Sequence, residues 1–71
     1  MLTAYQELSL INKIEEMRTV STKRALRRND SVFKFLNQLN AFGFLTAEKY
    51  KELDERRYCA LMKINYKGET K

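Results

Sequence analysis

The sequence predicts an all-α protein, a small bundle of three helices in one domain. The chain has 71 residues, no proline and two glycines, so little in it interrupts a helix. Apolar residues recur at steps of three and four in three separate segments, which is the spacing of one helix face. We expect one helical domain over residues 1–66 and a frayed tail over residues 67–71.

The first helix is predicted to run from Thr3 to Arg18. Thr3 and Gln6 have the spacing of a capping box, in which the hydroxyl accepts a free backbone N–H and the amide reaches back. The apolar face is wide, which indicates contact with more than one neighbour. It consists of Tyr5, Leu8, Leu10, Ile11, Ile14 and Met17.

The second helix is predicted to begin after a cap at Ser21 or Thr22 and to end near Phe42. Two interpretations stay open in its middle, because the Asn-Asp-Ser triplet at residues 29–31 favours turns and caps. Either the helix is continuous, or it ends near Asp30 and a fourth helix begins there. The apolar face after the triplet is expected to form the centre of the core, and it consists of Val32, Phe33, Phe35, Leu36, Leu39 and Phe42.

The third helix is predicted to run from Ala47 to Ile64 or Tyr66. Gly43 precedes it and suits the left-handed conformation in which helices commonly end. Thr46 is a good N-cap for the new helix. We expect Arg57 at the edge of its inner face, and the inward side chains are expected to be Tyr50, Leu53, Ala60, Leu61 and Ile64.

The segment from Phe33 to Leu61 has the pattern of an αα-hairpin, two helices joined by a Gly-Phe-Leu-Thr turn. In outline it resembles the short C-terminal helical hairpins, the SHOCT type, found at the ends of many bacterial proteins. The resemblance implies a C-terminal αα-hairpin over less than half of the chain, and we do not assign the chain to that family. The residues that carry it are Leu36, Leu39, Gly43, Leu45, Thr46, Glu48 and Tyr50.

Self-association is the expected source of additional stability, because a chain this short buries only a modest share of its surface. Cys59 is the only cysteine and there is no histidine, so no disulfide forms within the chain and no zinc ligand set exists. The apolar residues of the second helix exceed what two thin neighbours cover, and we therefore expect a homodimer. A single thiol favours a reduced, cytoplasmic setting.

The middle of the chain carries a run of positive charge. The formal net charge is +5, and between residues 18 and 34 the only acid is Asp30. So much like charge in one place opposes compaction, so the surplus predicts an anionic partner outside the molecule. Six cations are the candidate nucleic-acid-binding residues: Arg18, Lys23, Arg24, Arg27, Arg28 and Lys34.

The leading hypothesis is a small nucleic-acid-binding accessory or regulatory protein that docks on phosphates through this central helix. Arginine suits that task because its planar fork pairs with phosphate oxygens. The alternative is a protein-interaction module, of the kind that phages and plasmids use as inhibitors or adaptors, that binds an acidic surface of a partner protein. A helix-turn-helix is disfavoured because Arg24 and Arg27 would occupy positions that need apolar side chains. Binding to a membrane is disfavoured because the basic segment offers few apolar anchors.

Catalysis has little support in the sequence. The chain has no histidine and no glycine-rich phosphate loop, and its adjacent acids, such as Glu15 and Glu16, point to different parts of a helix surface. A lone cysteine in a helix is more often a small buried side chain than a nucleophile. We therefore predict a binding protein rather than an enzyme, with no metal and no cofactor.

Overall fold

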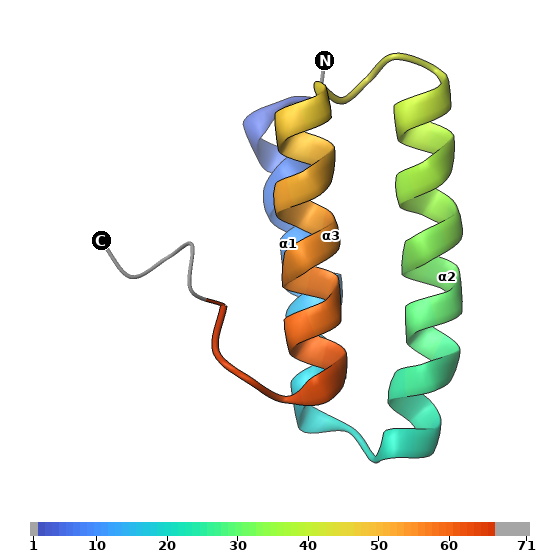
Figure 1. Cartoon of the computed structure of the whole chain (residues 1–71), viewed down its shortest axis with the longest axis vertical. Coiled ribbons are helices and arrows are strands. Elements are labelled where there is room, and N and C mark those ends of the chain that lie inside the picture. The colour runs from blue at the N-terminus through green and yellow to red at the C-terminus, as the bar shows by residue number, and fades with distance from the viewer. Residues whose placement is uncertain (1, 67–71) are drawn as a thin grey trace.

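Three helices pack side by side in the computed structural model of the chain, which describes residues 2–66. α1 (Ala4–Glu16) leads through a 3₁₀ turn, η1 (Met17–Thr19), to α2 (Thr22–Ala41), and α3 (Ala47–Met62) follows. Successive helices run in opposite directions, and α3 packs against both of the others, whereas α1 and α2 meet each other directly far less (Figure 1). The prediction of an all-α fold with three helices is confirmed. The predicted frayed tail, residues 67–71, lies outside the described residues.

The helices begin at caps that the sequence predicts. The Thr3 hydroxyl accepts the backbone N–H of Gln6 at 3.1 Å, and the Gln6 amide oxygen accepts the backbone N–H of Thr3 at 3.0 Å. Ser21 caps α2 and Thr46 caps α3 through their side-chain oxygens. Each such cap satisfies a backbone donor that the helix leaves free and stabilises its helix by about 1 kcal/mol.

α2 is continuous through residues 29–31, so the interpretation with a fourth helix is wrong. Asn29 does not turn back on its own backbone, because its Oδ1 accepts a hydrogen bond from Arg57 of α3 at 2.6 Å. Arg57 is also ion-paired with Asp54 at 2.9 Å, and its guanidinium lies 5.0 Å from the centre of the Phe33 ring. The polar triplet that favours a turn in the sequence thus supplies a contact between α2 and α3.

α2 ends as the sequence predicts, at a glycine in the left-handed conformation. Gly43 has a φ of 80°. Its N–H donates to the carbonyl of Asn40 at 3.1 Å, and the N–H of Phe44 donates to the carbonyl of Leu39 at 2.9 Å. These two bonds form a Schellman motif, which satisfies carbonyl groups that the helix end leaves free.

α3 ends earlier than predicted, at Met62 rather than at Ile64 or Tyr66. Lys63 adopts the left-handed conformation with a φ of 59° and occupies the position that Gly43 has after α2. A residue with a Cβ atom adopts this conformation at a cost of about 1–2 kcal/mol. No glycine marks this helix end in the sequence, which is why the pattern places it too late.

The Lys63 side chain compensates for that cost by binding the connection between α1 and α2. Its ammonium donates to the carbonyls of Met17 at 3.2 Å, Arg18 at 3.1 Å and Val20 at 2.8 Å. Arg18 in turn donates to the carbonyl of Ile64 at 2.6 Å. We call these bonds the C-terminal clasp, because they hold the segment after α3 against the η1 turn.

The core is built from aliphatic side chains on the inner line of each helix. On α2 this line is formed by Ala25, Val32 and Leu36, each 6% exposed or less. No charged or polar residue within residues 2–66 is buried. The complete core consists of Leu10, Ile14, Met17, Ala25, Val32, Leu36, Leu39, Leu45, Leu53 and Ala60.

Half of the α2 face predicted as the centre of the core is buried, namely Val32, Leu36 and Leu39, and the prediction is wrong for the three phenylalanines. Phe33 is 41% exposed, Phe35 is 46% exposed and Phe42 is 75% exposed. Residues three, four or seven apart share one line of a helix, and the line through Val32 and Leu36 faces the neighbouring helices. Phe33 and Phe35 lie on either side of this line, so their rings lie at its margins.

Some apolar residues of α1, and Ile64 after α3, are likewise exposed although they were predicted to lie on an apolar or inward face. Tyr5 is 81% exposed and Leu8 is 56% exposed, so the apolar arc of α1 is wider than the surface that its neighbours cover. Ile64, expected to point inward, is 49% exposed because α3 has already ended. Within residues 2–66, none of the helices has the length and apolar character needed to cross a bilayer.

Candidate nucleic-acid interface

A line of cations lies on the outer face of α2, opposite its inner line. Lys23, Arg27 and Lys34 are four and seven residues apart, so they project from the same side of the helix. Arg24 lies beside them, nearer to α1 by helical spacing. All four side chains are exposed, and none forms an ion pair within residues 2–66. We call these four residues the basic strip.

Arg28 borders the basic strip but is already paired. Its guanidinium contacts the Glu16 carboxylate at 3.0 Å, and the two side chains are 47% and 58% exposed. An ion pair this exposed is screened by water and salt and contributes at most about 1 kcal/mol. Arg28 can therefore bind a phosphate only by exchanging one anion for another.

Arg18, the remaining candidate residue, is not brought into the basic strip. It lies in η1, where its Nε contacts Glu15 at 2.5 Å and its Nη1 belongs to the C-terminal clasp. Its side chain is 25% exposed. The Arg18 guanidinium thus stabilises the fold, and local sequence patterns do not reveal this contact because Ile64 is far away in the chain.

Some cations outside the strip connect helices, which those of the strip do not do within residues 2–66. Lys49 of α3 contacts Glu7 of α1 at 2.9 Å and Glu52 of its own helix at 3.4 Å. The hydrogen bond that Lys49 donates to the Glu7 carboxylate raises the pKa of Lys49 above its ordinary value, although partial burial opposes the shift. Arg57 joins α3 to Asn29 of α2. Lys49 and Arg57 thus stabilise contacts between helices, whereas the cations of the basic strip form no such contact within residues 2–66.

One anion, Asp30, lies on the outer face between Arg27 and Lys34. It is exposed and forms no ion pair within residues 2–66, although it is three residues after Arg27 and four before Lys34. A carboxylate at this place repels phosphate. It therefore lowers the positive potential of the strip at its centre.

Two exposed apolar side chains border the strip on the side of α3. Neither was predicted from the sequence to lie at the surface. Leu26 is 51% exposed and Phe33 is 41% exposed. They are seven residues apart, and each directly precedes a strip cation, Arg27 or Lys34. This repeat of an apolar residue followed by a cation at a seven-residue interval is the signal in the sequence that marks them.

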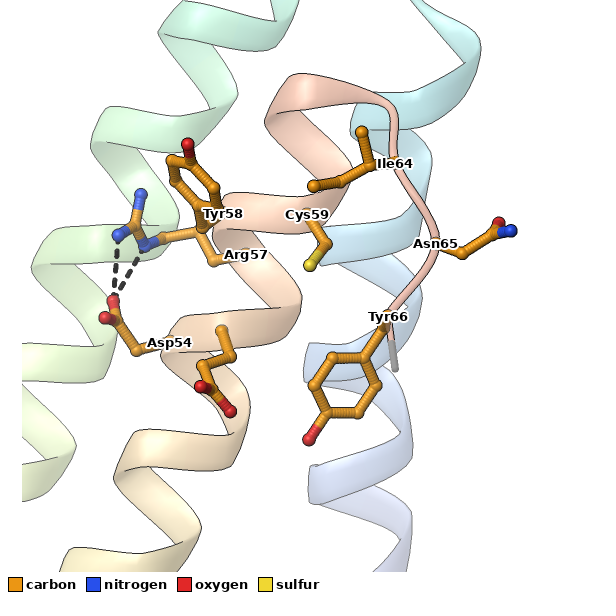
Figure 2. Close-up of a pocket in the computed structure, with 8 residues that line it drawn as sticks. Asp54, Arg57, Tyr58, Cys59, Ile64, Asn65 and Tyr66 are labelled. Atoms are coloured by element: carbon orange, nitrogen blue, oxygen red, sulfur yellow. Dashed lines mark hydrogen bonds and ion pairs between the residues drawn. The ribbon is translucent and has the colours of Figure 1, made fainter. Parts of the chain in front are cut away.

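A separate cleft of about 390 Å³ lies between the last turns of α3 and residues 64–66 (Figure 2). Cys59, Tyr58 and Tyr66 are among the residues that line it. The Cys59 thiol has no hydrogen-bond partner within residues 2–66, and the Asp54 carboxylate at the rim is held by Arg57. Among the residues that line the cleft within residues 2–66, the Cys59 thiol is not paired with a base.

No family model, no curated protein and no solved structure matches this chain. The likeness of residues 33–61 to the short helical hairpins therefore remains one of outline.

Proposed function

We propose that this chain is a small nucleic-acid-binding protein, of the accessory or regulatory kind, that docks on phosphates through the basic strip. One observation carries the proposal: Lys23, Arg24, Arg27 and Lys34 are exposed on one helix with no acidic partner within residues 2–66. Cations that only keep a protein soluble are more often spread over its surface and paired with acids. The role is binding rather than catalysis, and a cytoplasmic location belongs to the same proposal.

The mechanism is electrostatic. From Lys23 to Lys34 the strip extends about 16 Å along the helix, which is long enough to contact several successive phosphates. Each phosphate that a cation neutralises releases counterions, so binding weakens as salt is added. With three or four phosphates neutralised, affinity for duplex DNA should fall about 100-fold between 50 mM and 200 mM salt.

The direct test is fluorescence anisotropy with labelled duplex DNA and RNA, using the wild type and the variants Arg27→Gln and Lys34→Gln. Both variants should bind several-fold more weakly, because each removes one phosphate contact. Lys51→Gln is the matched control, since Lys51 is an exposed lysine of α3 without an ion pair in the described structure. Equal weakening by Lys51→Gln would show that net charge, not the strip, determines binding. Arg28 is unsuitable for this test because its loss also breaks the pair with Glu16.

A second candidate function is docking on an acidic surface of a partner protein. The observation that favours it is the apolar border of the strip, Leu26 and Phe33, because exposed aromatic and aliphatic groups beside arginine are typical of protein interfaces. Co-purification after nuclease treatment separates the two functions. A stoichiometric protein partner that is retained by the wild type and lost with Leu26→Gln supports this second candidate.

A further inference from the structure

A hollow opens between α1 and α2, the two helices that contact each other least. Its volume is about 170 Å³, and its lining is mostly apolar: Leu2, Gln6, Phe35, Leu39 and Phe44. A second hollow of about 120 Å³ shares Phe35 with the first and is also lined by Lys13 of α1. We call the two hollows together the groove. α3 packs on both helices but leaves this groove uncovered.

The same face also carries a projecting ring. Phe42 follows Phe35 by seven residues, which places both on the flank of α2 that faces α1. Phe42 is 75% exposed, and Phe44 beside it in the chain is 43% exposed. An apolar cavity of about 150 Å³ accepts a benzene ring, so a hollow of this size can hold one phenyl group. This face thus carries both an exposed phenyl ring, Phe42, and a hollow that can hold a phenyl ring.

None of the residues that line the first hollow is charged. No residue from Phe35 to Ala47 is charged, and the chain from Met1 to Gln6 has no charged side chain. A strongly acidic or basic partner therefore finds no counter-charge in the first hollow, and the second hollow contributes Lys13. Lys23, Arg27 and Lys34 lie on the outer face of α2, and Arg24, although on the flank towards α1, lies near the opposite end of the helix from Phe42. Two copies can therefore meet here with their basic strips apart, so the repulsion between two molecules of charge +5 is small.

The apolar area at this face is large enough to matter for association. Phe35, Phe42 and Phe44 together leave on the order of 300 Å² of ring surface exposed per copy. Two copies therefore contribute more than half of the roughly 1,000 Å² that a specific interface must bury. Leu2 and the walls of the groove add to this area.

We propose that a second copy of this chain covers the groove, and that Phe42 of each copy inserts into the hollow between α1 and α2 of the other. A ring and its receptor on one face are what a two-fold symmetric interface requires, because each copy must offer both halves of every contact. The dimer carries two basic strips, both left free. Its formation does not depend on the proposed nucleic-acid binding.

The test is light scattering during size-exclusion chromatography, combined with sedimentation equilibrium, on the full chain without nucleic acid. The wild type should have twice the 8.5 kDa mass of the chain. Phe42→Ser should raise the dissociation constant at least about 30-fold, the effect of losing a central aromatic anchor. Gln6→Glu should do the same because it places a charge at the hollow.

Tyr5→Ser is the matched control, because Tyr5 is 81% exposed and lies on the far side of α1 from the buried Leu10 and Ile14. It should leave the dimer intact. Circular dichroism should show unchanged helix content in all variants, since each replaced side chain is exposed. The proposal is overturned by a wild type that stays monomeric at high protein concentration, or by a dimer that Phe42→Ser and Gln6→Glu weaken no more than Tyr5→Ser.

Discussion

The C-terminal clasp predicts that one exposed lysine has an unusually large effect on stability. Lys63→Ala removes three hydrogen bonds from the ammonium to backbone carbonyls, at 2.8–3.2 Å. Hydrogen bonds to a charged group contribute about 1.5–3 kcal/mol when shielded from water, and two of these three are exposed, so we expect a loss of about 2 kcal/mol in total. Lys63→Gly loses the same bonds but relieves the left-handed strain, about 1 kcal/mol, so its net loss should be about 1 kcal/mol.

Thermal and urea unfolding followed by circular dichroism measures both losses. For a domain of this size 1 kcal/mol corresponds to about 4–8 °C in melting temperature, so Lys63→Ala should melt roughly 10 °C below the wild type. Lys51→Ala, which removes an exposed lysine without such contacts, should stay within about 0.5 kcal/mol of the wild type. A Lys63→Ala variant as stable as Lys51→Ala would contradict the stabilising role of the three Lys63 hydrogen bonds. A glycine variant less stable than the alanine variant would refute the assignment of strain.

Three further predictions concern single residues. Gly43→Ala should destabilise by about 1–2 kcal/mol in urea unfolding, because the added Cβ meets nothing within 4 Å and the cost is the left-handed backbone alone; a gain in stability would contradict the φ of 80°. The pKa of Lys49 is raised in the folded state, so the pair with Glu7 stabilises fully below the ordinary value of 10.5 and is lost as the pH rises through the folded value. The difference in melting temperature between the wild type and Lys49→Met should therefore shrink above pH 10.5, and a constant difference would contradict it. Asp30→Asn should bind duplex DNA about two- to fivefold more tightly in anisotropy, because it removes the one carboxylate on the outer face of α2; weaker binding would contradict the placement of Asp30 in the phosphate path.

The parts of the fold that depend on local signals could be predicted from the sequence. The capping box of Thr3, the cap of Thr46 and the left-handed Gly43 each depend on residues within one turn of the chain. The end of α3 could not be predicted in this way, because the left-handed Lys63 is stabilised by carbonyls some 45 residues away in the chain. The structural role of Arg18 could not be predicted for the same reason, because its hydrogen-bond partner Ile64 is 46 residues away in the chain.

The exposed phenylalanines show a different limit of sequence periodicity. A broad apolar arc defines a face of a helix, but which line within the arc becomes buried depends on where the neighbouring helices lie. On α2 the neighbours cover Val32 and Leu36, and Phe33 and Phe35 remain at the margins. Five of the six predicted cations lie on α2, and Arg18 lies in η1. The separation of free cations from paired ones required the positions of Glu15 and Glu16.

Phosphate binding by the free cations on the outer face of α2 is the centre of the proposed function. It is tested most directly by the slope of log binding constant against log salt concentration for duplex DNA, compared between the wild type and the double variant Arg27→Gln/Lys34→Gln. Three or four neutralised phosphates predict a wild-type slope of about −3, and the loss of two contacts predicts a slope of about −1 for the variant. A wild-type slope near zero, or an equal slope for both proteins, would contradict the claim.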